Sequence, residues 1–319
     1  MSKADYIEGV GGLPVFKAPF GFEDVNISGF FLKADKSKLK AMCDKYLNSI
    51  LSEYEYRPIS SYVVLTYADM KGRSKAPSQA DIGYVQESEV AFWVVVGKFK
   101  KGIVDIPVGI GVFLPHLFLD NSFAMLAGRE VYGFNKVQAV FNSKPTAIYN
   151  PEFNMSTLGF KEFSRDSLAE IFPLISVKNL SKPSKSTWSD GEHKKSIFEL
   201  IEKIVDREHF LLEKLESSFL DHLIKLFSPK VPMIFLKQFR DATDSSLACY
   251  QAIIEADAEP THFNSGGFLD GEFEIKIEAL ANYPLIEEFG FDMPDGKCVT
   301  DFGFWLDFSF ELDNGVEIS

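Results

Sequence analysis

Three long apolar runs between residues 62 and 141 constrain the fold of this chain more than any other feature. They are YVVLTYADM, YVQESEVAFWVVVGKF and IPVGIGVFLPHLFL, and glycine, proline or polar clusters separate them. Their richness in β-branched and aromatic residues predicts β-strands. Because the runs are too continuously apolar for a sheet with one face in water, they predict strands buried on both faces, as in a filled or ligand-holding barrel.

Two other segments carry a helical pattern. Residues 30–51 predict a strand followed by an amphipathic helix, in which Asp35 or Ser37 caps the start. The apolar positions of this helix recur at three- and four-residue spacing, at Leu39, Met42, Cys43, Tyr46, Leu47 and Ile50. Residues 192–227 predict long amphipathic helices after a polar loop, and Ser189 with Glu192 fits a capping box. We therefore expect a mainly β, α+β fold with a single domain over residues 1–319 and a helical insert at about 163–228.

Composition excludes several classes of function. A net charge of −13 opposes binding to a phosphate backbone, and the sequence has no cluster of basic residues with interleaved aromatic residues. We therefore expect no nucleic-acid partner. No apolar run is long enough to span a bilayer and the N-terminus lacks the order of a signal peptide, so we expect no membrane partner and a cytoplasmic protein. The three cysteines and five histidines share no ligand spacing. We expect no metal site and no cofactor.

One lysine has an unusual setting, in the segment GREVYGFNK, residues 128–136. This segment resembles the lysine-bearing segment of the acetoacetate decarboxylase family, in which a Gly-Arg-Glu turn leads to the lysine that forms a Schiff base. Upstream, DIGYVQESEVAF resembles the family segment that supplies an active-site glutamate. The resemblance implies a barrel of that family's type, oligomers of identical chains, Lys136 as the reactive amine, and Glu87 or else Gln86 as the carboxylate position. It also implies that Arg129, Glu130 and Phe134 contribute to the substrate site.

The chemistry needs a neutral amine. Burial in an apolar pocket penalises the ammonium and lowers the pKa of a lysine, and the neutral amine can then add to a ketone and form a Schiff base. Phe134, Val137 and the phenylalanine-rich strands predict such a pocket around Lys136. The alternative is an ordinary lysine at a strand edge, with its ammonium in water. Likewise, Glu87 is either a proton-transfer group or a solvated strand residue, and Arg129 and Glu130 are more simply explained as structural supports of the turn.

Several positions depart from the family pattern. Val137 stands where the family has a second lysine, and Asn135 stands where it has proline. The segment EDVNISGFFLKAD lacks the family's arginine, and a second carboxylate is missing near Val63. An acidic substrate would lack its guanidinium partner here, which opens the substrate class to neutral carbonyl compounds.

The sequence thus favours cofactor-independent Schiff-base chemistry on a small keto acid or ketone. Decarboxylation is the reaction that the resemblance implies. An aldolase or dehydratase reaction on the same lysine is a close alternative, and a non-catalytic barrel that binds a small molecule is the alternative from another class.

Overall fold

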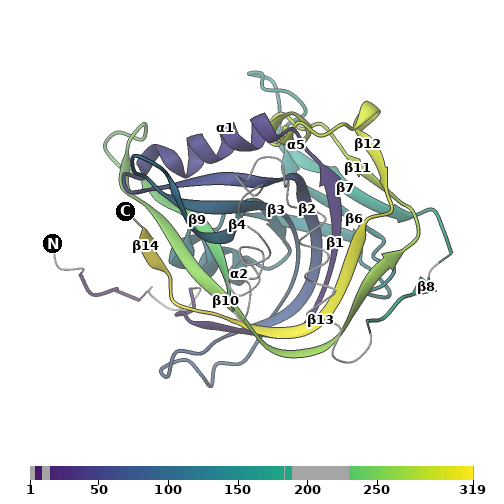
Figure 1. Ribbon diagram of the computed structural model, residues 1–319, viewed down its shortest axis with the longest axis horizontal. Helices are drawn as coiled ribbons and strands as arrows, with labels where there is room; N and C mark the ends of the chain where they lie inside the picture. Colours follow the sequence, from purple (N-terminus) through teal and green to yellow (C-terminus); the bar gives the residue numbers. More distant parts are fainter. Residues whose placement is uncertain (1–3, 9–14, 183, 189–229, 319) are drawn as a thin grey trace.

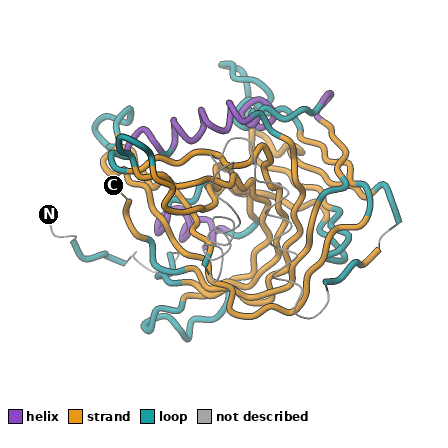
Figure 2. Tube along the Cα trace, in the orientation of Figure 1, coloured by secondary structure: helices purple, strands orange, loops and turns teal. Residues whose placement is uncertain are grey.

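The computed structural model describes residues 4–8, 15–182, 184–188 and 230–318. One hydrogen-bonded sheet of 14 strands dominates it, as the strand colouring in Figure 2 shows. The strands are β1 (Phe20–Lys33), β2 (Tyr54–Ser74), β3 (Val85–Lys100), β4 (Ile106–Leu119), β5 (Lys136–Ser143), β6 (Phe153–Gly159), β7 (Glu170–Asn179), β8 (Ser184–Lys185), β9 (Val231–Arg240), β10 (Ala248–Asp270), β11 (Phe273–Ile277), β12 (Lys297–Thr300), β13 (Gly303–Leu312) and β14 (Val316–Ile318). The α-helices are α1 (Lys36–Tyr46), α2 (Ser122–Ala127) and α5 (Leu285–Phe289).

Seven of these strands close into a ring (Figure 1). Going round it, β4, β3, β2, β1, β13, β10 and β9 pair in turn, and all these pairs are antiparallel. A short parallel pairing of β4 with β9, at Val112 with Met233 and Phe113 with Ile234, completes the circle. The barrel expected from the sequence is therefore present as a closed ring.

A second layer covers one side of the ring. Strand β5 leaves the ring parallel to β4, and β6, β7, β11 and β12 follow it in hydrogen-bonded order. The largest apolar cluster joins β3, α1, α5 and this layer, and it contains the fully buried side chains Phe92, Leu39, Phe289, Phe153 and Phe273. Alternate residues of β3 therefore pack in this cluster or inside the ring. That arrangement confirms the prediction of strands buried on both faces.

Helix α1 forms where the sequence predicts it. The Asp35 carboxylate accepts a hydrogen bond from the Ser37 backbone N–H at 2.7 Å, which caps the first turn. Leu39 and Cys43 are fully buried against the main cluster.

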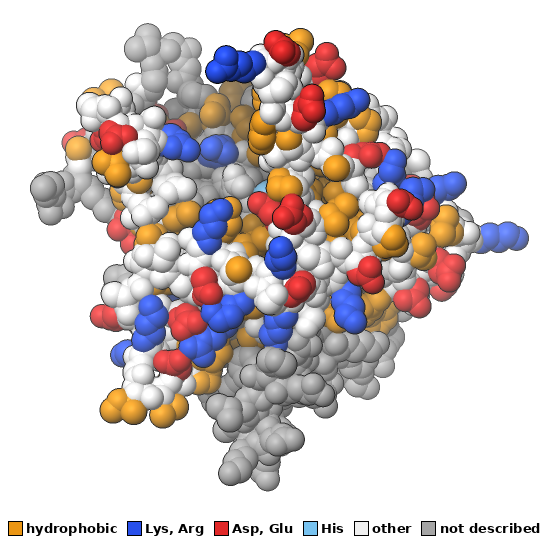
Figure 3. Space-filling model, turned by 90° about the horizontal axis from the view of Figure 1, so that it is seen from above, with side chains coloured by type: hydrophobic (Ala, Val, Ile, Leu, Met, Phe, Trp, Pro, Cys, Tyr) orange, Lys and Arg blue, Asp and Glu red, His pale blue; other side chains and the backbone are white. Residues whose placement is uncertain are grey.

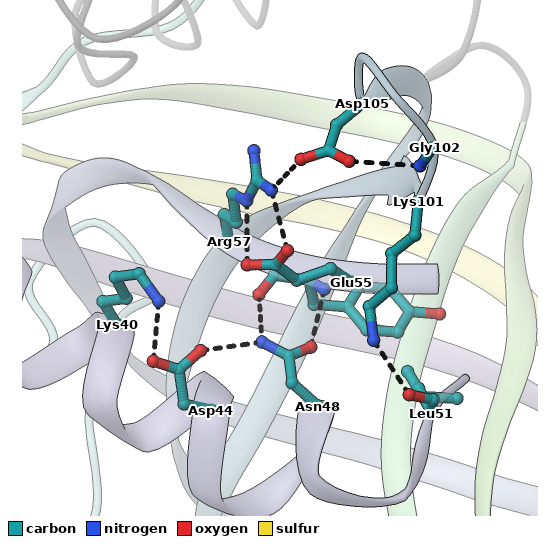
Figure 4. Close-up of polar contacts among 10 residues, drawn as sticks. Lys40, Asp44, Asn48, Leu51, Glu55, Arg57, Lys101, Gly102 and Asp105 are labelled. Carbon is teal, nitrogen blue, oxygen red and sulfur yellow. Dashed lines mark hydrogen bonds and ion pairs between the residues drawn. The ribbon is translucent and has the colours of Figure 1, made fainter. Parts of the chain in front are cut away.

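The polar side of α1 is joined to the strands by the network in Figure 4. Asn48 donates to Asp44 at 3.0 Å and to the Tyr56 carbonyl at 2.9 Å. Arg57 pairs with Glu55 and also with Asp105, which lies in the turn between β3 and β4. These contacts fix the helix and that turn against the start of β2.

The expected insert at 163–228 is only partly covered by the described residues. Its described part includes β7 and β8, so the sequence-based start of the helical region at residue 163 is wrong. Strand β7 pairs on both sides, with β6 and β11, which makes it part of the second layer. The predicted helices at 192–227, and the capping box at Ser189 and Glu192, lie outside the described residues.

The surface seen from above carries acidic and basic side chains interspersed, as Figure 3 shows. Among the described helices, none is long and apolar enough to cross a membrane.

Candidate functional site

Lys136 is the first residue of β5, and a short helical segment precedes it in the chain. Asn121 caps α2 by accepting hydrogen bonds from the N–H groups of Phe123 and Ala124. The helix then widens into a π-helical turn, Gly128–Tyr132, of a kind that is often found at functional sites. Gly133 ends this turn with a φ of 91°, a conformation that favours glycine. The sequence predicted a simple turn in this segment, whereas the structure has a helix that ends in a π-helical turn.

Gly128 lies directly against the Lys136 side chain. A Cβ at position 128 would stand 2.8 Å from Cδ of Lys136, 3.0 Å from Cε and 3.3 Å from Nζ. Arg129 holds the same segment from the other side, because its Nη1 donates to the Lys136 carbonyl at 2.9 Å. The Lys136 side chain therefore lies so close to Gly128 that any larger residue at position 128 would force it to move.

Two carboxylates of β3 face the amine. Nζ of Lys136 lies 3.6 Å from Oε2 of Glu87 and 3.9 Å from Oε2 of Glu89, both longer than a hydrogen bond. The side chains of Lys136 and Glu87 are 8% and 3% exposed, so this amine is not in bulk solvent. Oε2 of Glu87 is buried and has no hydrogen-bond partner among the described residues. A buried acceptor without a partner is uncommon and typical of sites that bind or react.

Glu89 titrates in the range where proton transfer at neutral pH is possible. Burial raises the pKa of its carboxyl to about 7, with the ammonium of Lys136 opposing the rise and the carboxylate of Glu87 adding to it. A group with such a pKa can both accept and return a proton near pH 7.

Apolar side chains form the walls around this triad. The Phe134 ring lies 5.0 Å from Nζ of Lys136. Other lining residues come from the inner face of the ring, at Phe20, Phe22, Met70, Met233, Phe310 and Leu312. The site is therefore one amine and two carboxylates in a pocket whose other walls are mainly apolar.

The comparison with solved structures finds matches over nearly the whole chain. Acetoacetate decarboxylase from Legionella pneumophila is 14% identical with a TM-score of 0.57, over 100% of this chain and 98% of that one. An acetoacetate decarboxylase-like enzyme from Sphingomonas wittichii is 10% identical with a TM-score of 0.58, over 100% of both chains. The chain has the acetoacetate decarboxylase-like fold.

The same fold occurs in MppR, an enduracididine biosynthesis enzyme, which is 11% identical with a TM-score of 0.57 over 97% of this chain and 91% of that one. No family model matches the sequence, and no curated protein matches it either. At these identities the likeness establishes the fold, and all three of these neighbours are enzymes.

The acetoacetate decarboxylase-like fold brings together three of the six residues that the sequence nominated. Lys136, Glu87 and Phe134 line one pocket. Gln86 does not, because alternation along β3 turns it outward, where it is exposed. Arg129 supports the lysine backbone from outside the pocket, and Glu130 lies beside the N-terminal residues Tyr6 and Glu8, so neither is a lining residue.

Glu89 and Gly128 are the site residues that the sequence reasoning missed. Glu89 follows Glu87 by two positions, and residues at that spacing share one face of a strand. This spacing is visible in QESEV, residues 86–90, but the resemblance pointed only to Glu87 or Gln86.

The departures from the family pattern have structural explanations. Val137 packs against the main apolar cluster on the side of β5 away from the amine. Asn135 donates to the Pro115 carbonyl at 2.7 Å and so ties the end of the turn to β4. Within the described residues, no group of three or more His, Cys, Asp or Glu side chains could hold a metal ion.

Proposed function

We propose that this chain is a Schiff-base-forming lyase that acts on a small ketone or keto acid through Lys136. The observation that carries the proposal is the arrangement of the amine, which is buried among apolar side chains and faces Glu87 and Glu89 at under 4 Å. An amine in that setting can pass a proton to a carboxylate and attack a carbonyl carbon.

The steps follow from the positions of these groups. The neutral amine of Lys136 adds to the carbonyl, and the carbinolamine loses water to give an iminium. The iminium draws electrons from the adjacent carbon, so that carbon can lose either carbon dioxide or a proton. Glu89, with its raised pKa, serves as the acid and base for these transfers, and Glu87 stabilises the cationic nitrogen. Water then releases the product and restores the amine.

Decarboxylation is the reaction that the acetoacetate decarboxylase neighbours suggest, and aldol or dehydration chemistry is the second candidate. A specific observation favours this second candidate: one solved MppR complex contains the condensation product of pyruvate and imidazole 4-carboxaldehyde. A condensation product of two carbonyl compounds thus fits a protein of this fold. Assembly into homo-oligomers and a cytoplasmic location remain predictions.

Borohydride trapping tests the proposal. The protein is incubated separately with acetoacetate, pyruvate and acetylacetone, reduced, digested and mapped by mass spectrometry. We expect a reduced adduct on the peptide that contains Lys136, and we expect it to be absent from Lys136→Met. The control is Lys33→Met, which removes an exposed strand lysine and should leave the labelling unchanged. If a compound is retained tightly but no carbonyl compound labels Lys136 of the wild type, the chain is a binding protein.

A further inference from the structure

The charges around Lys136 are unfavourable for an anionic substrate. Of the residues that line the pocket, four are acidic or basic: Lys136, Glu87, Glu89 and Arg73. Both carboxylates lie within 4 Å of the one amine, so a substrate carboxylate attached near the carbonyl would enter a space that already holds two acidic groups. In a buried site the charged form of either carboxylate would repel an anion strongly at such distances.

Arg73 does not offset this, because strand geometry turns it to the outer face of the ring. Arg73 lies opposite Gly21 in the register of β1 and β2, so the two residues point to the same face of the sheet. A Cβ placed on Gly21 would lie 3.1 Å from the Lys75 side chain, which marks this face as the outer one. Its guanidinium pairs with Glu23 at 3.1 Å and stacks on the Tyr84 ring at 5.0 Å. Both partners are more than 40% exposed, so these contacts hold the Nη2 end of Arg73 on the solvent side, while its Nε is buried without a hydrogen-bond partner among the described residues.

The walls of the pocket favour an apolar group instead. Phe22 and Phe310 stack at 4.6 Å and point into the ring next to Met70. Phe22, Phe310 and Met233 are only partly buried although they lie on the inner face. Apolar surface of this kind, open inside a pocket, gains free energy when an apolar ligand covers it.

From these observations we infer that the substrate is a neutral ketone or aldehyde with a branched aliphatic or aromatic group, and that the reaction at Lys136 is proton transfer at the carbon next to the carbonyl. This inference rests on the proposed function and restricts its substrate class. The iminium forms with loss of water, a β3 carboxylate takes the α-proton, and the electron pair of the C–H bond becomes the enamine. Return of a proton, or addition of the enamine to a second carbonyl, gives an iminium again, and water hydrolyses this iminium to release the product and the Lys136 amine.

An isosteric pair of ketones tests the inference. In 5-methylhexan-2-one an isopropyl group occupies the place of the carboxylate of 4-oxopentanoate. Each is incubated with the protein in D₂O, and proton NMR measures exchange of the α-hydrogens. We expect kcat/KM for exchange to be about 100-fold higher for the neutral ketone, and we expect Glu87→Gln to narrow that ratio. Acetoacetate should release no more carbon dioxide with the wild-type protein than with Lys136→Met.

The outcomes separate this inference from the proposed function. If 4-oxopentanoate exchanges as fast as its neutral partner, or acetoacetate is decarboxylated through Lys136, the inference is overturned and the Schiff-base proposal stands. If neither ketone exchanges, the inference is overturned, and if in addition no carbonyl compound labels Lys136 after borohydride reduction, the proposed function is overturned as well. Arg73→Gln provides a further arm. A selective loss of 4-oxopentanoate turnover in that variant would also overturn the inference, with Lys71→Gln, which removes an exposed lysine paired with Asp24, as the matched control.

Discussion

The contact between Gly128 and Lys136 allows the position of the amine to be perturbed without removing any functional group. In Gly128→Ala, the new methyl group would stand 2.8 Å from Cδ of Lys136, whereas carbon atoms in ordinary contact lie about 3.5–4.0 Å apart. The lysine side chain must therefore move by about 1 Å. Misplacement of a reacting atom by this distance costs up to about 100-fold in rate, or about 2.7 kcal/mol in the barrier.

The backbone itself accepts this substitution. Gly128 has a φ of −62° and a ψ of −43°, which are ordinary helical values. Alanine in a helix is more favourable than glycine by about 0.5–1 kcal/mol, and this gain offsets part of the cost of moving the lysine. We therefore expect the free energy of unfolding to change by no more than about 1 kcal/mol while the reaction slows.

The assay compares the rate of borohydride-trapped adduct formation on Lys136 with the urea unfolding midpoint of the same variant. Gly109→Ala is the matched control, because a Cβ there meets only Cβ of Lys98, at 3.9 Å. Wild-type labelling rates in a folded Gly128→Ala protein would refute the reasoning. A loss of stability above about 3 kcal/mol would also refute it, since the strain would then lie in the backbone.

Three further substitutions test other parts of the structure. Glu89→Gln should abolish the limb of the pH–rate profile near pH 7. Folding raises the pKa of Glu89 from 4.5 to about 7, so the folded protein keeps a proton that the unfolded chain loses. The free energy of unfolding of the wild type should therefore fall by on the order of 3 kcal/mol as the pH rises from 4.5 to about 7. Urea titrations of Glu89→Gln should lack that fall. Leu39→Ala should lower the free energy of unfolding by about 2–5 kcal/mol without changing the labelling of Lys136, because this fully buried residue lies in the main core. Asp35→Ala should cost about 1 kcal/mol through loss of the cap on α1, as measured by thermal unfolding.

The site was partly predictable from local pattern. The spacing of Glu87 and Glu89 places both on one face of β3. The motif GREVYGFNK pointed to Lys136, but it did not predict the π-helical conformation of Gly128–Tyr132. Gln86 remained an alternative to Glu87, because a strand buried on both faces gives no apolar–polar alternation that identifies the pocket side. Only the pairing of β3 with β2 and β4 decides it.

The sequence by itself determined the elements whose signals are local: the long strands β2, β3 and β4, with their continuous apolar runs, and α1 with its cap. Tertiary structure alone decided that β4 meets β9 to close the ring, that β7 is a strand of the second layer, and that Glu89 of β3 faces Lys136 of β5 across the intervening strand β4. The physical reason is that periodicity and capping depend on neighbours along the chain, whereas strand register, the π-helical turn and the burial of a charge depend on groups that folding brings together from distant segments.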